Sequence, residues 1–250
     1  IPKKGIVIAF GENPFVKEAL KGLTNVITYG YTSSNDFYAE NISFDDNGFP
    51  EYDICHEGKV LCHLHLGVPG EHNVLNSMAA YVTSSYLGVN DEVIASTLKA
   101  FRGTHRRFDF TGVTRNGVRI VDDYAHHPTE IKATLAAASN VKHNKLRVVF
   151  QPHTYTRTKA LFDDFIDSFD HVDSLIITDI YAAREKDVYG VSSYQLVNAI
   201  KAKHPDREAY YVQDFEDIVK YLSANAEEGD IVMTMGAGDV YKVGQMMLKA

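Results

Sequence analysis

The 250-residue sequence predicts an α/β protein of two domains, the second of them built on a mostly parallel sheet. Its second half alternates short apolar runs with helical segments of about 10 to 15 residues, which is typical of βαβ units. Its first half contains three consecutive strand-like runs separated by turn dipeptides, which is typical of an antiparallel meander. The length fits one large domain or two ordinary ones, and the change of pattern favours two.

The composition argues against several other classes of protein. Hydrophobic residues make up 45% of the chain and charged residues 23%, as in an average globular domain. The formal net charge of −8 argues against a dedicated nucleic-acid binder. No apolar run approaches the roughly 20 residues of a membrane-spanning helix, so no membrane association is expected. Cys55 and Cys62 are too few for a disulfide framework, which makes a cytoplasmic setting the expected one.

The first elements expected along the chain are strands and one short helix. Asn13 followed by Pro14 predicts a helix that begins there and reaches about residue 20. Turn sequences at residues 46–48 (Asp-Asn-Gly) and 57–58 (Glu-Gly) separate the runs of the meander. The expected strands cover residues 4–10, residues 25–29 and three runs between residues 37 and 66.

Two longer helices are expected next, at residues 70–87 and 91–101. The first places apolar and small side chains on one face at helical spacing: Val74, Met78, Tyr81, Val82 and Ser85. The second begins with an acidic residue. Residues 102–107 are polar and contain a glycine, so we place the boundary here and expect domains at residues 1–107 and 108–250.

The second half then alternates regularly between the two kinds of element. Strands are expected at residues 118–122, 146–150, 174–178, 209–212 and 231–235. Helices are expected at residues 129–139, 157–169, 192–203, 215–225 and 239–248. Right-handed crossovers between parallel strands then place ligand sites at the carboxyl ends of the strands.

Polar side chains follow four of these expected strands. The segments are residues 122–128, 151–157, 179–185 and 236–239, and they contain His, Arg, Asp, Tyr and Gly. Polar loops are ordinary taken singly. Four such loops at one edge of a parallel sheet predict a binding site there.

Each candidate in these loops also has a structural interpretation. Asp122 and Asp123 repel one another unless a cation is near or ribose hydroxyls bind them, but they could equally cap a strand end. Arg157 could clamp a phosphate or carboxylate, or lie on the surface. His126 lies before Pro128 at an expected helix N-terminus, where an anion is favoured. The turn at residues 236–238 (Gly-Ala-Gly) lacks a correctly placed third glycine, so a tight turn is favoured over a nucleotide loop.

Two further clusters lie in the first half. A group of soft ligands lacks the spacing of a zinc site, so no metal site is predicted: Cys55, His56, Cys62, His63 and His65. Asn73 and Asn76 share a helix face, where two carboxamides could bind one flat ring such as adenine, or could simply cap the helix.

In combination, these segments resemble the Mur ligase family over nearly the whole chain and in the family's order. The central-domain motif is matched by residues 70–80 (Gly-x-His-Asn-x-x-Asn-x-x-Ala-Ala) and the inter-domain segment by residues 106–109 (Arg-Arg-Phe-Asp). Residues 122–131 (Asp-Asp-Tyr-Ala-His-His-Pro-Thr-Glu-Ile) and 150–158 (Phe-Gln-Pro-His-x-Tyr-x-Arg-Thr) are similar to the alanine-adding members, and residues 235–239 (Met-Gly-Ala-Gly-Asp) also fit. The resemblance implies a Rossmann-like C-terminal domain, preceded by the C-terminal part of a central ATP-binding domain.

The resemblance also implies roles for residues that bind ATP. Asn73 and Asn76, with His72 beside them, would form the adenine pocket. Arg107 would reach the nucleotide phosphates and Asp122 the ribose hydroxyls. Mg²⁺ would accompany ATP, with most of its ligands outside this chain.

A second set of residues would face the muramate and the incoming amino acid: Tyr124, His126, His153 and Arg157. Among these, His126, His153 and Arg157 are the expected catalytic residues, with His126 as the candidate base. Many family members carry Arg where this sequence has Thr154, so one cationic contact expected of that loop is absent or supplied elsewhere. Asp179, Arg184 and Glu185 are expected on the same edge, without an assigned role.

The implied reaction uses ATP to phosphorylate the carboxylate of UDP-N-acetylmuramate, after which the amine of L-alanine displaces the phosphate. Negative charge builds in both steps, which explains the Arg and His residues. Two rival interpretations remain open: a relative that attaches a recycled peptide to the same nucleotide, and a non-catalytic binding module. Tyr124 and the Gln-Pro-His segment favour alanine addition.

The family's phosphate-binding loop, which ends in Gly-Lys-Thr or Gly-Lys-Ser, is absent from the sequence. The chain opens with Ile1 rather than Met, and we expect it to be a fragment of a longer protein. The 250-residue chain alone is therefore expected to bind ATP weakly and to show no alanine-dependent ADP release.

Overall fold

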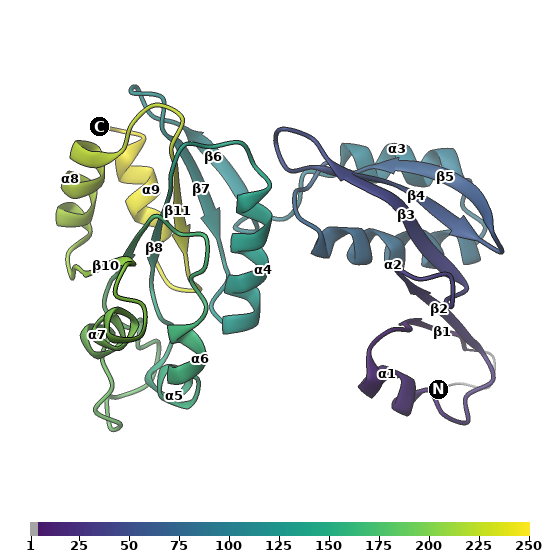
Figure 1. Cartoon of the computed structure of the whole chain (residues 1–250), viewed down its shortest axis with the longest axis horizontal. Helices are drawn as coiled ribbons and strands as arrows, with labels where there is room; N and C mark the ends of the chain where they lie inside the picture. Colours follow the sequence, from purple (N-terminus) through teal and green to yellow (C-terminus); the bar gives the residue numbers. More distant parts are fainter. Residues whose placement is uncertain (1–4) are drawn as a thin grey trace. The chain divides into compact units, whose positions relative to one another are not determined.

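The structure, a computed structural model, describes residues 5–250. The chain divides into two compact units, Ile1–Arg102 and Gly103–Ala250, which are called the N-terminal and C-terminal units. The fold is the expected α/β class, with parallel and antiparallel pairing in both sheets (Figure 1). Within residues 5–250, no helix combines the length and the apolar character needed to cross a membrane.

The N-terminal unit contains a five-stranded sheet in sequential order. Its strands are β1 (Val7–Phe10), β2 (Val26–Gly30), β3 (Phe37–Phe44), β4 (Pro50–His56) and β5 (Lys59–His65). β1, β2 and β3 pair in parallel, whereas β3, β4 and β5 form the predicted antiparallel meander. The strand expected at residues 4–10 begins at Val7, and residue 4 lies outside the described part of the chain.

Three helices complete this unit. They are α1 (Pro14–Ala19), α2 (His72–Tyr86) and α3 (Asp91–Ala100). α1 begins as predicted, because the Asn13 side chain accepts hydrogen bonds from the N–H groups of Phe15 and Val16. α2 buries Val74, Met78, Tyr81 and Val82 against the sheet, as its periodicity predicts, together with Ser77. α3 is capped by Asn90, one residue before the expected acidic start.

The C-terminal unit is a six-stranded sheet in the order β10-β9-β8-β11-β7-β6. Its strands are β6 (Asp109–Val113), β7 (Arg119–Asp123), β8 (Leu146–Phe150), β9 (Ser174–Ile177), β10 (Glu208–Tyr211) and β11 (Ile231–Met235). Every neighbouring pair is parallel except β6 and β7. The mostly parallel sheet confirms the predicted fold class.

Helices cover both faces of this sheet (Figure 1). They are α4 (Pro128–Ser139), α5 (Tyr155–Ala160), α6 (Phe162–Ile166), α7 (Ser193–Lys203), α8 (Phe215–Asn225) and α9 (Tyr241–Met247). One apolar core joins α4, α6 and α7 to the sheet through residues such as Leu135, Phe165 and Leu196. A second core on the opposite face contains Ile218 of α8 and Val243 of α9.

Two elements of this unit differ from the prediction. The edge strand β6 was not expected, because its residues are half exposed and a register shift between Phe110 and Gly112 disturbs its alternation. The helix expected at residues 157–169 is two short helices, because Leu161 between them adopts φ −113° and ψ 22°, outside the helical region.

A capping box begins α7. Ser192 Oγ accepts a hydrogen bond from Gln195 N at 3.2 Å, and Gln195 Oε1 accepts one from Ser192 N at 3.0 Å. Ser192→Ala removes the first bond and is expected to lower the free energy of unfolding by about 1 kcal/mol. Urea denaturation followed by circular dichroism measures this. Ser139→Ala, at the exposed end of α4, is the control, and equal losses in the two variants would contradict the capping role.

Candidate functional site

The carboxyl ends of β7, β8, β9 and β11 lie at one edge of the C-terminal sheet, because these strands are parallel neighbours. Four side chains from three of the following loops are in contact there, and we call them the rim cluster: Tyr124, His126, His153 and Tyr181. The rings of Tyr124 and His126 are 5.3 Å apart, those of His126 and His153 5.7 Å, and those of His153 and Tyr181 5.7 Å and stacked. The structure therefore brings together three of the side chains predicted to face the acceptor substrate.

His126 is held by acceptors at one ring nitrogen. Its Nδ1 lies 2.9 Å from the carbonyl oxygen of Tyr124 and 3.3 Å from Oε2 of Glu130. A carbonyl and a carboxylate can only accept, so Nδ1 carries a proton and the neutral ring has its acceptor at Nε2. An imidazole oriented by a carboxylate in this way can take a proton from a substrate.

Glu130 is fixed in turn by the start of α4. Its Oε2 accepts hydrogen bonds from the N–H groups of His126 at 3.0 Å and His127 at 3.1 Å. Burial acts to raise the pKa of Glu130, but these N–H donors and the two histidines outweigh it and lower the pKa. Glu130 is thus a carboxylate at neutral pH. Pro128 occupies the first turn of α4 as predicted, and His127 caps the helix.

His153 Nδ1 has the opposite hydrogen-bonding role to His126 Nδ1, because its neighbour is a donor. Arg157 Nη1 lies 3.3 Å from His153 Nδ1. A guanidinium can only donate, so His153 accepts at Nδ1 and carries its proton at Nε2. Burial lowers the pKa of His153, and the nearby Arg157 and His126 lower it further. The imidazole is therefore neutral near pH 7 and offers an N–H donor.

Arg157→Gln is expected to raise the pKa of His153, because it removes a cation whose field disfavours the imidazolium. An NMR titration of the His153 Cε1–H resonance measures this. Arg184→Gln is the matched control, since Arg184 is an exposed arginine of the next loop and should leave the titration unchanged. An unchanged or lower pKa in Arg157→Gln would contradict this assignment.

Thr154 shapes the loop between His153 and Arg157. It adopts φ 64°, which is uncommon for a β-branched residue, and its side chain caps α5 by accepting from Arg157 N at 3.5 Å. Glu185, from the loop after β9, accepts from Thr156 N at 2.8 Å. The loops after β8 and β9 are thus tied together beside Arg157.

Arg106 occupies a position that the sequence did not predict. Its Nε donates to Oδ2 of Asp122 at 2.8 Å, its Nη1 to the Gly238 carbonyl at 3.1 Å, and its Nη2 to the Gly236 carbonyl at 2.7 Å. Its guanidinium lies 5.0 Å from the centre of the Tyr124 ring. Arg106 therefore links the ends of β7 and β11 and contacts Tyr124 of the rim cluster.

The two candidate aspartates after β7 are buried and fully engaged. Asp122 is 3% exposed and also accepts from Thr234 Oγ1 at 2.7 Å. Asp123 accepts from the N–H groups of Phe108 and Ala125, both at 2.7 Å. Burial raises the pKa of Asp123, although these donors oppose the shift. The pair is thus stabilised by internal donors.

The side chain of Gln151, from the same unit, packs against the Gly236-Ala237-Gly238 turn. Gln151 Oε1 accepts from the N–H groups of Asp239 at 2.9 Å and Val240 at 3.1 Å, at the start of α9. A Cβ at Gly236 would lie 2.7 Å from the Gln151 carbonyl oxygen, and one at Gly238 would overlap Gln151 Oε1. The glycines permit this close approach, so the geometry is that of a tight turn.

Arg107 takes no part in this network of the described residues. It is exposed, and within residues 5–250 its guanidinium has no hydrogen-bond or carboxylate partner. Its neighbours Arg106 and Phe108 both adopt positive φ, 63° and 45°, so the backbone turns on either side of it. Arg107 is therefore free to contact a ligand.

In the N-terminal unit, His72, Asn73 and Asn76 lie on the first turns of α2. Asn73 donates from Nδ2 to the Pro69 carbonyl at 2.7 Å and accepts from Asn76 Nδ2 at 3.1 Å. The Asn76 carbonyl oxygen and its second N–H stay available. The described residues contain no group of three or more His, Cys, Asp or Glu side chains able to hold a metal ion.

The remaining sequence candidates lie outside the rim cluster. Asp179 Oδ1 accepts a hydrogen bond from the Tyr211 hydroxyl at 2.6 Å, which raises the pKa of Tyr211 to about 12. Arg184 is exposed. Reasoning from sequence missed Arg106, Glu130 and Tyr181. The Glu three residues after His127 is a capping-box signal that could have identified Glu130.

Comparison with known proteins matches both halves of the chain to domains of one family. The model of the Mur ligase glutamate ligase domain matches residues 106–238, and that of the Mur ligase middle domain matches residues 1–84. UDP-N-acetylmuramate–L-alanine ligase of Alkaliphilus metalliredigens is 50% identical over 249 residues, which cover 99% of this chain and 53% of the relative. The enzyme of the same name from Caldanaerobacter subterraneus is 46% identical over 250 residues, covering 100% and 54%. The chain thus spans about half the length of the curated relatives that it matches.

Solved structures agree on the fold. UDP-N-acetylmuramate-alanine ligase MurC of Thermotoga maritima superimposes with a TM-score of 0.76 at 27% identity, covering 98% of this chain and 51% of that protein. A murein peptide ligase of Psychrobacter arcticus gives a TM-score of 0.67 at 23% identity, covering 100% and 52%, which is a likeness of fold alone.

Proposed function

Because this chain belongs to the Mur ligase family, we propose that the full-length protein is an ATP-dependent ligase that joins L-alanine to UDP-N-acetylmuramate. The observation that carries the proposal is the rim cluster, where an imidazole oriented by Glu130 lies beside a neutral His153 and Arg157. The names of the curated relatives supply the substrates. Its place of action would be the cytoplasm, in keeping with the two free cysteines.

His126 would act on the attacking amine. In this reaction ATP phosphorylates the muramate carboxylate, and the alanine amine attacks the acyl phosphate and expels phosphate. An ammonium group cannot attack, so the amine must lose a proton. The free Nε2 of His126 is the proton acceptor in this proposal, and Glu130 stabilises the imidazolium that forms.

Arg157 and His153 would stabilise the negative charge that develops. Arg157 uses one nitrogen to hold His153 and keeps its other donors for a carboxylate or phosphate oxygen. His153 offers its Nε2–H in the same region. Tyr124, a residue that is 42% exposed beside His126, would contact the substrate directly.

The residues that the sequence motifs imply for ATP are carried into this proposal. Asn73 and Asn76, with His72 beside them, would bind adenine through the available groups of Asn76, and the unpaired guanidinium of Arg107 would bind phosphate. Both oxygens of Asp122 are engaged, so its contribution to the ribose site would act through its hold on Arg106. Mg²⁺ bound with ATP would offset phosphate charge, with most of its protein ligands outside this chain.

Residues 1–107 would then be the C-terminal part of a central ATP-binding domain, and residues 108–250 the C-terminal domain. The division of the chain at Arg102 and Gly103 supports this arrangement. The matches of the two family models, to residues 1–84 and 106–238, support it as well.

A coupled ADP-release assay on the full-length protein tests the proposal. ADP release should require both UDP-N-acetylmuramate and L-alanine, and the omission of either should reduce it to the background rate. Release that continues at the full rate without an amino acid would contradict ligase activity. No release under any condition would favour a non-catalytic binding module.

A further inference from the structure

Tyr181, in the loop after β9, is the member of the rim cluster that the proposed reaction leaves without a role. Its ring is stacked on the imidazole of His153, with 16° between the two planes and 5.7 Å between the ring centres. Tyr181 is 39% exposed, so it borders solvent at the site. Because His153 is the proposed donor to the substrate, the contact that fixes its ring bears on the reaction.

The backbone holds Tyr181 beside His153. Tyr181 N donates to the Pro152 carbonyl at 2.8 Å, and Thr154 N donates to the Tyr181 carbonyl at 2.9 Å, so a parallel bridge joins Tyr181 to His153. Within residues 5–250 these are the hydrogen bonds that Tyr181 forms, and its hydroxyl takes part in neither. The side chain therefore contributes an aromatic face to the cluster.

Gly238, in the loop after β11, leaves the space that the Tyr181 ring occupies. A Cβ at Gly238 would lie 2.7 Å from Cγ and 2.8 Å from Cδ2 of Tyr181. Gly238 does not adopt positive φ, so the close approach of the ring, rather than the backbone conformation, requires glycine there. The loops after β9 and β11 thus fit together at Tyr181.

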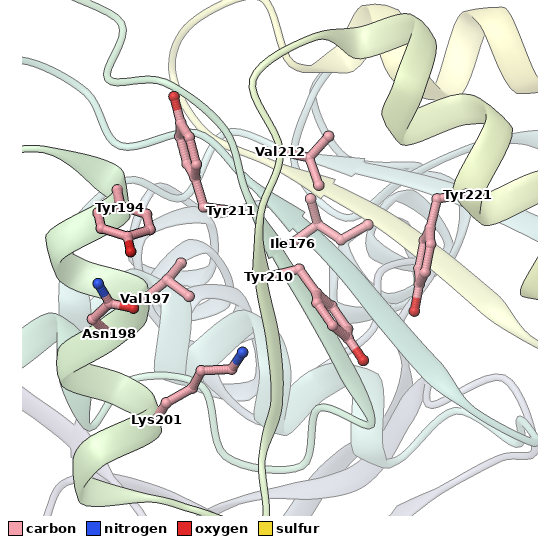
Figure 2. A pocket seen from close by; sticks show the side chains of 9 residues that line it. All are labelled: Ile176, Tyr194, Val197, Asn198, Lys201, Tyr210, Tyr211, Val212 and Tyr221. Carbon is pink, nitrogen blue, oxygen red and sulfur yellow. The ribbon is translucent and has the colours of Figure 1, made fainter.

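The base of the Tyr181 loop is anchored on both neighbouring strands. Thr178 N donates to the carbonyl of Phe150 in β8 at 3.1 Å, and Asp179 Oδ1 accepts from the hydroxyl of Tyr211 in β10 at 2.6 Å. Tyr211 also lines a groove of about 310 Å³ beside α7, and Figure 2 shows its side chain there. These anchors lie close to Tyr181 in the chain, so they restrict where its ring can lie.

The other neighbours of His153 fix one nitrogen but not the plane of the ring. Arg157 Nη1 lies 3.3 Å from Nδ1, and the His126 ring meets the imidazole at 69°. Burial is the main cause of the lowered pKa of His153; Arg157 and His126 lower the pKa further, whereas Glu185 opposes them. The flat face of Tyr181 both covers the imidazole and restricts its rotation.

We propose that Tyr181 is a positioning residue, whose ring fixes the plane of the His153 imidazole and so keeps Nε2–H aligned with the charge that develops on the substrate. This inference rests on the proposed ligase function. A donor stabilises developing charge only when it is held in the correct direction, and small misplacements of such groups are costly. The hydroxyl has no part in this role, so phenylalanine should replace tyrosine.

An NMR titration of His153 in the 250-residue chain tests the contact itself. Tyr181→Ala should raise the pKa of His153, because water then reaches the imidazole and stabilises its charged form. Tyr181→Phe should leave the pKa unchanged. Tyr189→Ala is the matched control, since Tyr189 is an exposed tyrosine further along the same loop. This measurement needs no substrate, so its result does not depend on the proposed function.

The kinetics of the full-length protein test the positioning role. Tyr181→Ala should lower kcat by about 10-fold to 100-fold, with KM for ATP within about threefold of the original. Tyr181→Phe should keep kcat within about threefold. Tyr181→Leu retains an apolar side chain beside Gly238 and serves where alanine disturbs the loop. It should also lower kcat by about 10-fold, because it offers no flat face to the imidazole.

Three results would overturn the proposal. They are an unchanged pKa of His153 in Tyr181→Ala, an unchanged kcat in both Tyr181→Ala and Tyr181→Leu, and a loss in Tyr181→Phe as large as that in Tyr181→Ala. The last result would assign the role to the hydroxyl. A full-length protein that releases no ADP before any substitution would instead contradict the ligase function, and the titration would still decide whether Tyr181 covers His153.

Discussion

If the full-length protein is the proposed ligase, replacing His126 by alanine is expected to lower its kcat by about 100-fold to 10,000-fold, the range found for the loss of a general base. The expectation rests on the geometry of the ring, in which acceptors hold Nδ1 and leave Nε2 as the proton acceptor. Because His126 is proposed to act on the amine, the step affected should be attack on the acyl phosphate. Formation of the acyl phosphate itself should persist.

Two measurements separate these steps. The rate of ADP release with L-alanine should fall, whereas hydroxylamine, which needs no base to attack, should still trap the activated carboxylate as a hydroxamate. His143→Ala is the control, because His143 binds the Val141 carbonyl in the loop before β8, at the opposite end of that strand. A kcat for His126→Ala within about threefold of the original would contradict the role of a general base.

Replacing Arg106 by alanine is expected to destabilise the C-terminal unit by about 3 to 5 kcal/mol, the cost of leaving a buried charge unpaired. The side chains of Arg106 and Asp122 are 15% and 5% exposed, so water would compensate little for the loss. The carbonyls of Gly236 and Gly238 would also lose their donors.

Native-state hydrogen exchange of β11 amides measures this effect for the C-terminal unit by itself. Arg107→Ala provides a neighbouring control and should change the free energy of unfolding by less than about 0.5 kcal/mol, because Arg107 is exposed. Adding Asp122→Asn to Arg106→Ala should recover part of the loss, since the buried charge is then removed as well. Equal losses in Arg106→Ala and Arg107→Ala would contradict the assignment.

Much of the fold could be predicted from the sequence because each buried strand is a short apolar run between turn signals. Residues 146–150 and 231–235 were predicted with the bounds of β8 and β11, and both strands are buried throughout. β6 was missed because its side chains face solvent and Gly112 disturbs the period. Edge strands of this kind carry little of the hydrophobic pattern on which such predictions depend.

The position of the candidate site could be predicted from the sequence, but the hydrogen bonds and ion pairs that hold its side chains could not. The strand-end rule brought Tyr124, His126, His153 and Arg157 to one edge, where the structure places them in contact. Which of two adjacent arginines points inward depends on backbone angles, and the positive φ of Arg106 carries no signature in a non-glycine residue. The burial of Asp122 beneath Arg106 is likewise a consequence of tertiary packing.

We propose that the rim cluster belongs to a ligase that adds L-alanine. The most direct test offers the full-length protein ATP, UDP-N-acetylmuramate and equimolar L-alanine and tripeptide, and identifies the nucleotide product by mass spectrometry. UDP-N-acetylmuramoyl-L-alanine is expected as the dominant product. A dominant tripeptide adduct would contradict the claim and identify a peptide-recycling ligase.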